Sequence, residues 1–223
     1  PDKEGYVQAN YNYAWYNNPY FMAYEFTQEH NRDVLNGQAK VIWDVTPEFS
    51  IQGRTSARLQ TLFEDMNVPK SYMNYGDSRN GDYKDWNTRQ LNVDADVLAT
   101  YSHAFSRNLA LTVNGGISSF YRRYQSEYQS TDGLIVPRVY NLSNSQGPVT
   151  ATNKLQEKAI NSVYGTANLD VYNAFFLTVT GRNDWSSTLP KGNNSYFYPS
   201  VAVSTLLSEY IKLPKYIDYL KAH

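Results

Sequence analysis

Two neighbouring carboxylates are the residues of this sequence that most directly suggest chemistry. Asp94 and Asp96 are separated by one residue, and two such groups can serve as the acid and the base of a glycosidase. In a strand they point to the same face, which also carries Arg54 and Arg58 on another predicted strand. Carboxylates among arginines are usually structural, so we predict that Arg54 and Arg58 form ion pairs with Asp94 and Asp96.

A second group of carboxylates precedes them. Asp82 and Asp85 allow the same acid–base interpretation, and together with Asp77 and Asn80 they could hold calcium. Their spacing does not fit the calcium loop of an EF-hand, so we interpret the group as a solvated loop.

The other common catalytic and cofactor signatures are missing from the sequence. It has no Cys, which excludes disulfides, thiolate metal sites and cysteine nucleophiles. The three His residues lie far apart in the sequence, at His30, His103 and His223, and do not predict a zinc site. Neither a serine nucleophile elbow nor a phosphate-binding loop is present. We therefore expect no catalysis, no cofactor and no metal.

The composition narrows the class of protein. The 223 residues contain 20 Lys and Arg against 21 Asp and Glu, whereas a nucleic-acid-binding protein would carry a basic face. No apolar run approaches the length of about 18 residues that a transmembrane helix needs, and the first residues do not form a signal peptide. The mean hydropathy of −0.60 and the 21 Tyr residues suit either a soluble β module or the alternating strands of a membrane barrel.

An alternation of period two predicts the strands that must position these residues. Odd-numbered residues are mostly apolar and even-numbered residues mostly polar across seven segments, with one phase throughout. The predicted strands cover about 35–45, 49–63, 91–105, 109–121, 163–171, 175–182 and 199–207.

The connections between these strands alternate in length. We predict tight turns at 46–48, 106–108 and 172–174, and long polar loops at 65–88, 122–160 and 184–196. Short turns at one end and long loops at the other are typical of outer-membrane barrels. Aromatic residues of the apolar phase lie near both ends and predict two interfacial girdles, formed by Trp43, Phe49, Phe63, Phe105, Tyr121, Phe175 and Trp185.

Several sequence motifs resemble one family. The segments Gly181–Pro190 (GRNDWSSTLP) and Asn193–Val201 (NNSYFYPSV) resemble a hallmark stretch of SusC/RagA-type TonB-dependent outer-membrane transporters. Further segments resemble the same family in the same order, namely Asn18–Phe21, Gly133–Pro137, Tyr140–Asn144, Ser162–Gly165 and Leu213–Lys221.

This resemblance implies a larger protein with a plug, a segment that contacts the TonB complex, and a 22-strand barrel. Residues 1–223 would then form an all-β, antiparallel part of the barrel wall, with about seven strands and the start of an eighth. Open edges are not tolerated in lipid, which agrees with a partial wall. The resemblance further implies the outer membrane of a Gram-negative bacterium of the bacteroidete type, and a SusD-like surface lipoprotein as partner.

The long loops supply the candidate substrate-binding residues. Aromatic rings can cover the apolar face of a sugar while carboxylates bind its hydroxyl groups. The residues that we select for this role are Tyr83, Trp86, Tyr124, Tyr128, Asp82 and Asp85. Packing of the aromatic residues on one another, or on the partner, remains an alternative for each of them.

These observations favour part of an energy-dependent importer of oligosaccharides, or secondarily of peptides, without bond chemistry of its own. Two alternatives from other classes stay open. One is a soluble, secreted, Tyr-rich β module that binds glycans, and the other is a carbohydrate-active enzyme. Solubility without detergent would distinguish both alternatives from the importer.

Overall fold

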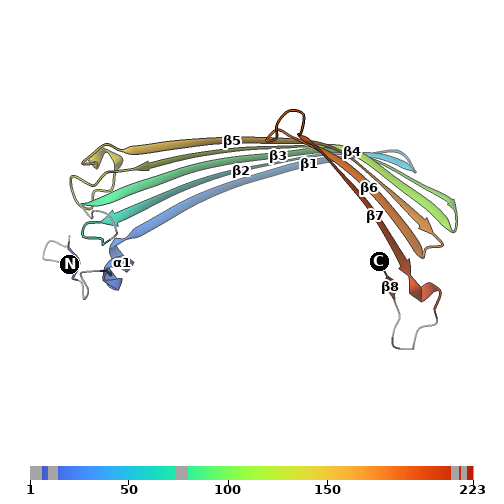
Figure 1. Ribbon diagram of the computed structural model, residues 1–223, viewed down its shortest axis with the longest axis horizontal. Helices are drawn as coiled ribbons and strands as arrows, with labels where there is room; N and C mark the ends of the chain where they lie inside the picture. Colours follow the sequence, from blue (N-terminus) through green and yellow to red (C-terminus); the bar gives the residue numbers. More distant parts are fainter. Residues whose placement is uncertain (1–6, 10–14, 74–79, 212–215, 217–219, 223) are drawn as a thin grey trace. The chain divides into compact units, whose positions relative to one another are not determined.

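The chain folds almost entirely into β-structure. The computed structural model describes all residues except 1–6, 10–14, 74–79, 212–215, 217–219 and 223. Eight strands form one sheet in which each strand pairs with its neighbours in the sequence (Figure 1). The elements are α1 (Pro19–Glu25), β1 (Thr27–Thr46), β2 (Phe49–Pro69), β3 (Gly81–Ser106), β4 (Leu109–Ser130), η1 (Leu142–Asn144), β5 (Thr150–Val171), β6 (Phe175–Ser186), β7 (Ser195–Leu206), η2 (Leu207–Glu209) and β8 (Lys221–Ala222). The all-β antiparallel fold expected from the sequence is confirmed.

The chain divides into two compact units, and β1 to β5 contribute to both. Unit 1 comprises residues 1–35, 58–91 and 123–156, which include α1 and the parts of β1 to β5 far from the tight turns. Unit 2 comprises residues 36–57, 92–122 and 157–223, which include the tight turns and β6 to β8. No helix in the described part of the chain is long and apolar enough to cross a membrane.

Unit 1 contains a small apolar core. Phe21 of α1 and Val68 near the end of β2 are buried, and Leu134, in the connection after β4, has an exposed fraction of 0%. Helix α1 begins where Asn18 accepts hydrogen bonds from the backbone N–H groups of Tyr20 and Phe21, with a proline in the first turn. Burial thus stabilises the connections at this end of the strands rather than the sheet itself.

Unit 2 contains the tight turns. Between β5 and β6, Tyr172 and Asn173 both adopt positive φ angles, and Val171 pairs with Phe175. This register and the three-residue connection 172–174 agree with the sequence prediction. The other two connections are one residue shorter than predicted, because β1 extends to Thr46 and β3 to Ser106.

The long loops are shorter than the sequence predicted. Strands continue through much of the predicted loops, and the long connections cover 70–80, 131–149 and 187–194 instead of 65–88, 122–160 and 184–196. The prediction failed because it identified strands by an apolar face. Residues 82–90 and 122–130 are polar or aromatic on both faces, yet they complete a backbone ladder that needs no apolar face to form.

Candidate functional site

The parity of residue numbers defines two faces of the sheet. Side chains that contact each other across neighbouring strands carry numbers of the same parity. Even-numbered examples are Arg54–Asp96, Thr100–Asn114, Ser102–Thr112, Arg182–Ser162 and Thr178–Asn168, and odd-numbered examples are Asn67–Thr27, Ser119–Asn161 and Asn183–Ser195. The alternation predicted for each strand therefore extends across β1 to β7, whereas β8 has the opposite parity because Thr205 pairs with Ala222. We call the two sides the odd face and the even face.

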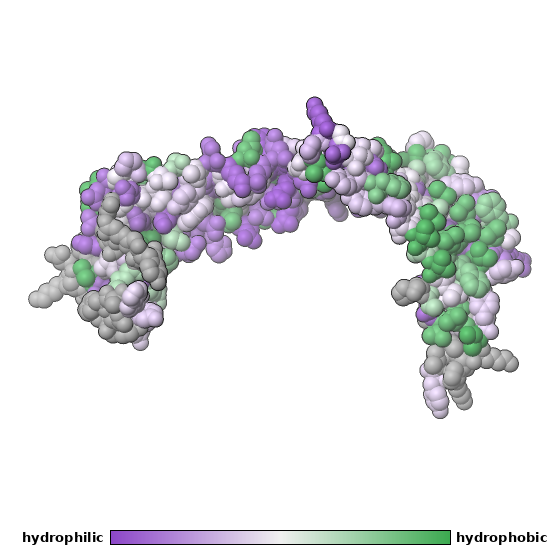
Figure 2. All heavy atoms as spheres, viewed as in Figure 1, coloured by the Kyte–Doolittle hydropathy of each residue, from purple (hydrophilic) through white to green (hydrophobic). Residues whose placement is uncertain are grey.

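The odd face is apolar and solvent-exposed. Large apolar side chains that would normally be buried are exposed on it, including Val41, Val97, Leu177, Val201 and Val203. Val201 has an exposed fraction of 67%, whereas Ser162 on the even face is buried at 3%. Figure 2 shows the apolar side chains gathered over β6 and β7. An exposed apolar surface that covers neighbouring strands indicates a contact with lipid or with another protein.

Charged groups confine the apolar surface to one part of the odd face. Odd-numbered residues carry no Asp, Glu, Lys or Arg over 35–45 in β1, 49–63 in β2, 91–105 in β3, 109–121 in β4, 159–171 in β5, 175–185 in β6 and 195–205 in β7. Beyond these segments the odd face of the strands carries Glu29, Asp33, Asp65, Asp85, Arg89, Arg123, Glu127 and Glu157. Three of the uncharged segments have 11 residues, within the 9–11 with which a tilted strand crosses a bilayer, and the other four have 13 or 15.

The predicted girdle residues lie at the margins of this surface. Near the tight turns, the side chains of Trp43, Phe105 and Phe175 are exposed and Phe49 is half-buried. At the other margin Phe63 and Trp185 are exposed, and the Tyr121 hydroxyl donates a hydrogen bond to Oε1 of Glu157 at 2.8 Å. Their role as interfacial girdles stays a prediction.

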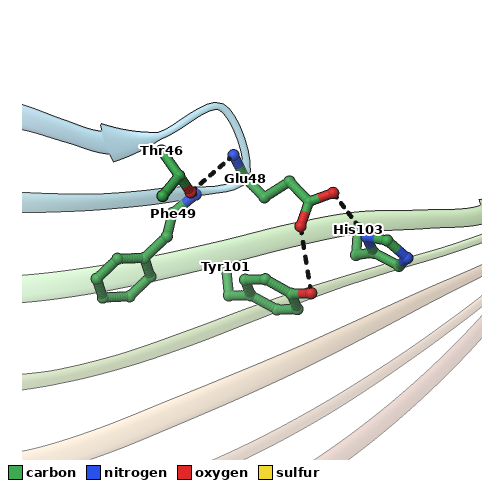
Figure 3. A network of polar contacts seen from close by, with 5 residues as sticks. All are labelled: Thr46, Glu48, Phe49, Tyr101 and His103. Atoms are coloured by element: carbon green, nitrogen blue, oxygen red, sulfur yellow. Dashed lines mark hydrogen bonds and ion pairs between the residues drawn. The ribbon is translucent and has the colours of Figure 1, made fainter.

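A polar network fixes the first tight turn to the next hairpin (Figure 3). Oγ1 of Thr46 accepts hydrogen bonds from the backbone N–H groups of Glu48 and Phe49. The Glu48 carboxylate then lies 2.7 Å from Nδ1 of His103 and accepts a hydrogen bond from the Tyr101 hydroxyl at 3.4 Å. This network is not evident from the sequence, because Glu48 lies in a turn and reaches a strand of the next hairpin.

One predicted ion pair of the even face is present in unit 2. Nε of Arg54 lies 2.7 Å from Oδ1 of Asp96, across β2 and β3. Arg58 does not pair as predicted but donates a hydrogen bond to the Gln60 side chain of its own strand. Within the described part of the chain, the Asp94 carboxylate forms no ion pair and is exposed beside the Arg54–Asp96 pair.

A second charged group lies on the same face and was not among the site residues selected from the sequence. Arg182 donates hydrogen bonds from Nε to Asp184 at 2.6 Å and from Nη2 to Oγ of Ser162 at 2.8 Å. Its guanidinium carbon lies 5.6 Å from the centre of the Tyr164 ring. That ring lies over Gly116, where an added Cβ atom would be 2.6 Å from Cζ of Tyr164. The shared even parity of Gly116, Tyr164 and Arg182 is the sequence signal that could have revealed this group.

Both groups line one cavity on the even face of unit 2. It has a volume of about 270 Å³ and lies over β2 to β6. Its lining includes Arg54, Asp94, Asp96, Phe120, Tyr164 and Arg182.

The six predicted substrate-binding residues lie on β3 and β4 in unit 1. The rings of Trp86 and Tyr128 contact each other, with centroids 5.0 Å apart. Tyr124 shares their even face, whereas Tyr83 and Asp85 have odd parity. Oδ1 of Asp82 accepts a hydrogen bond from the backbone N–H of Gly133, so this carboxylate supports the connection after β4. The structure therefore places an aromatic pair together but not all six residues.

Two of these residues have perturbed acidity. Burial, and secondarily the charge of Asp65, raise the pKa of Asp85 above its usual range. Burial, followed by the charges of Asp85 and Asp65, also raises the pKa of Tyr83. Among the described residues, no group of three or more His, Asp or Glu side chains could hold a metal ion. Asp77, which belonged to the calcium alternative, lies outside the described residues.

Solved transporter structures contain a similar fold. A chain of the structure described as the RagAB peptide transporter matches with a TM-score of 0.73 and 18% identity, over 87% of this chain and 22% of that one. Chains of the RagAB peptide importer match in the open-open state (TM-score 0.72, 16% identity, 87% and 21% covered) and in the closed-closed state (0.69, 17%, 83% and 20%). This chain thus has the fold of part of these transporter chains and spans about a fifth of their length. No family model matches the sequence, and no curated protein does either.

Proposed function

We propose that the chain is part of the wall of an outer-membrane, TonB-dependent nutrient importer. The observation that carries the proposal is the apolar odd face, on which large aliphatic side chains are exposed across neighbouring strands. In this proposal the odd face contacts lipid and the even face lines the lumen. The whole chain is then one partial barrel domain that performs no bond chemistry.

The charge distribution supports a membrane boundary along the strands. In unit 2 the odd face of the strands carries one acidic residue, Glu157, whereas in unit 1 it carries both acidic and basic residues. A charge on the lipid face at mid-bilayer costs roughly 2–4 kcal/mol for Arg or Lys. We therefore assign the bilayer-spanning strands to unit 2 and the extracellular extension to unit 1.

The proposed substrates are oligosaccharides. Hydroxyl and amide side chains dominate the even face near the tight turns, as in the pairs Thr100–Asn114 and Ser102–Thr112. Such groups donate and accept hydrogen bonds and match the hydroxyl groups of sugars. Oligopeptides are the second candidate, because the similar solved structures are described as peptide importers.

The proposed partners are a SusD-like surface lipoprotein and the TonB complex. Tyr20 and Tyr24 of α1 are exposed, as are Ile135, Val136 and Val139 in the connection after β4. Arg138 of this connection forms an ion pair with Glu25 of α1, which holds the two segments together within unit 1. Exposed aromatic and aliphatic side chains of this kind are typical of protein interfaces, which supports docking of the lipoprotein here. Contact with the TonB complex would involve segments outside this chain.

Fractionation and growth test this proposal together. The intact protein should be recovered in the outer-membrane fraction of its Gram-negative host, and its mobility on gels should change with heating, as for a folded barrel. Deletion of its gene should abolish growth on an oligosaccharide as sole carbon source while growth on the corresponding monosaccharide continues. Recovery in the soluble fraction would contradict the proposal and favour the secreted glycan-binding module. Lost growth on oligopeptides alone would replace the sugar substrate with the peptide.

A further inference from the structure

We propose that the even-face cavity of unit 2 is a binding subsite for a neutral sugar ring. The inference rests on the proposed function, because it treats the even face as the lumen wall. It places a substrate contact on the wall itself, separate from the aromatic residues of unit 1.

The charges of the cavity disfavour an anionic ligand. Arg54 is paired with Asp96, and Arg182 is paired with Asp184. The two arginines and the three carboxylates Asp94, Asp96 and Asp184 together carry one net negative charge, which corresponds to Asp94, unpaired among the described residues. A neutral ligand with many hydroxyl groups can donate hydrogen bonds to Asp94 without disturbing the ion pairs.

The polar groups available to a ligand match the hydroxyl groups of a sugar. The Asp94 carboxylate forms no ion pair within the described residues and can accept hydrogen bonds from two adjacent hydroxyls. Arg54 uses Nε for Asp96, and its side chain, with an exposed fraction of 58%, retains Nη donors for a ligand oxygen.

The cavity also provides an apolar surface. The Thr100–Asn114 and Ser102–Thr112 contacts set the register of β3 and β4, and the same register places Phe120 directly across from Asp94. Phe120 is half-buried and lines the cavity. A hexose or pentose ring has an apolar face and a rim of hydroxyls, which suits an aromatic ring opposite a carboxylate.

A peptide fits this cavity less well. Extended peptides usually gain affinity by pairing their backbone with a free strand edge. The cavity lies over β2 to β6, whose backbone groups already pair with neighbouring strands on both sides.

Binding of simple sugars to the intact protein in lipid nanodiscs tests the inference. The probes are D-glucose, D-galactose, D-mannose and D-xylose, titrated at millimolar concentrations by saturation-transfer NMR, with trialanine as the peptide probe. We expect at least one sugar to bind the wild-type protein. Asp94→Asn and Phe120→Ala should each raise its Kd at least about tenfold, because hydrogen bonds to a charged group and aromatic contacts are worth that much.

Asp44→Asn is the matched control, because it removes an even-face carboxylate outside the cavity and should leave the Kd unchanged. Heat-dependent gel mobility verifies that each variant assembles. If Asp94→Asn does not assemble, the Kd of Phe120→Ala is compared with that of the wild-type protein instead. Absence of sugar binding to the wild-type protein, equal binding by all variants, or trialanine binding that Asp94→Asn abolishes would overturn the inference. Fractionation measures outer-membrane location independently of sugar binding. A protein that is found in the outer membrane but binds no sugar would therefore refute only this inference and not the proposed function.

Discussion

Nε of Arg54 in β2 lies 2.7 Å from Oδ1 of Asp96 in β3, and the Asp96 side chain is far less exposed (11%) than that of Arg54 (58%). The pair is therefore only partly shielded from solvent, and a partly wet lumen would screen it further. We expect a coupling free energy of about 0.5–1 kcal/mol in a double-mutant cycle of Arg54→Ala and Asp96→Ala, measured by reversible unfolding. A control cycle of Arg54→Ala and Asp44→Ala should give no coupling free energy, because Arg54 forms its ion pair with Asp96. Equal coupling in the two cycles would show that the contact contributes nothing specific.

Two adjacent glycines of β4 provide a test of packing on the even face. A Cβ atom at Gly116 would lie 2.6 Å from Cζ of Tyr164 and 2.8 Å from the carbonyl oxygen of Val97. At Gly115, on the odd face, it would meet nothing within 4 Å. Gly116→Ala should therefore lower the free energy of unfolding by about 1–3 kcal/mol, and Gly115→Ala should change it by less than about 0.5 kcal/mol. Similar values for the two variants would mean that the Tyr164 ring does not occupy this position.

Asp85 should make the stability of the protein depend on pH. Burial and the nearby Asp65 raise its folded-state pKa above the usual value of about 3.9, so the folded state binds this proton more readily than the unfolded state. Stability must then fall as pH rises from the unfolded-state pKa through the raised one, and remain lower above it. Asp85→Asn should stabilise the protein at pH 7 and have no stabilising effect below the unfolded-state pKa. Equal effects at both pH values would exclude this linkage.

The sequence predicted the strand segments that have one apolar and one polar face, and it did not predict those that lack this alternation. The apolar phase from Leu35 to Val45 predicted a strand and its apolar face, because one side of that segment is uniformly apolar and the other almost wholly polar. Residues 82–90 have no such phase and were predicted as a loop, although they continue β3. Helix α1 was not predicted because its seven residues are too few to show a helical repeat of apolar positions. Its only start signal is Asn18 followed by Pro19.

The candidate site was predictable only in part for a related reason. Parity placed Arg54 and Asp96 on one face, but the pairing of their strands also depends on register between hairpins, which no local motif sets. The same register decides that Arg182 contacts Ser162 and Tyr164, and it was not available from the sequence.

Two tryptophans test the predicted substrate contact against the predicted membrane girdle. Trp86 contacts Tyr128 on the even face of unit 1, whereas Trp185 is exposed on the odd face of unit 2. Trp86→Ala should weaken oligosaccharide binding by the intact importer by about 0.5–1.5 kcal/mol beyond the loss of buried area, and Trp185→Ala should leave it unchanged. Calorimetric titration of each correctly assembled variant with the oligosaccharide measures its binding free energy. Loss of binding in Trp185→Ala alone, with assembly intact, would refute the assignment.

The most direct test of the account is the environment of each face in a bilayer. Nitroxide labels at Val41, Val97 and Leu177 should be relaxed by oxygen dissolved in the lipid, because the proposed function places the odd face against acyl chains. Labels at Gln38, Asp96 and Thr178 should be relaxed by a polar reagent in the aqueous lumen. The intact protein in vesicles should give this pattern at all six positions. The reverse pattern, or equal access of the polar reagent to both sets, would contradict the assignment of the odd face to lipid.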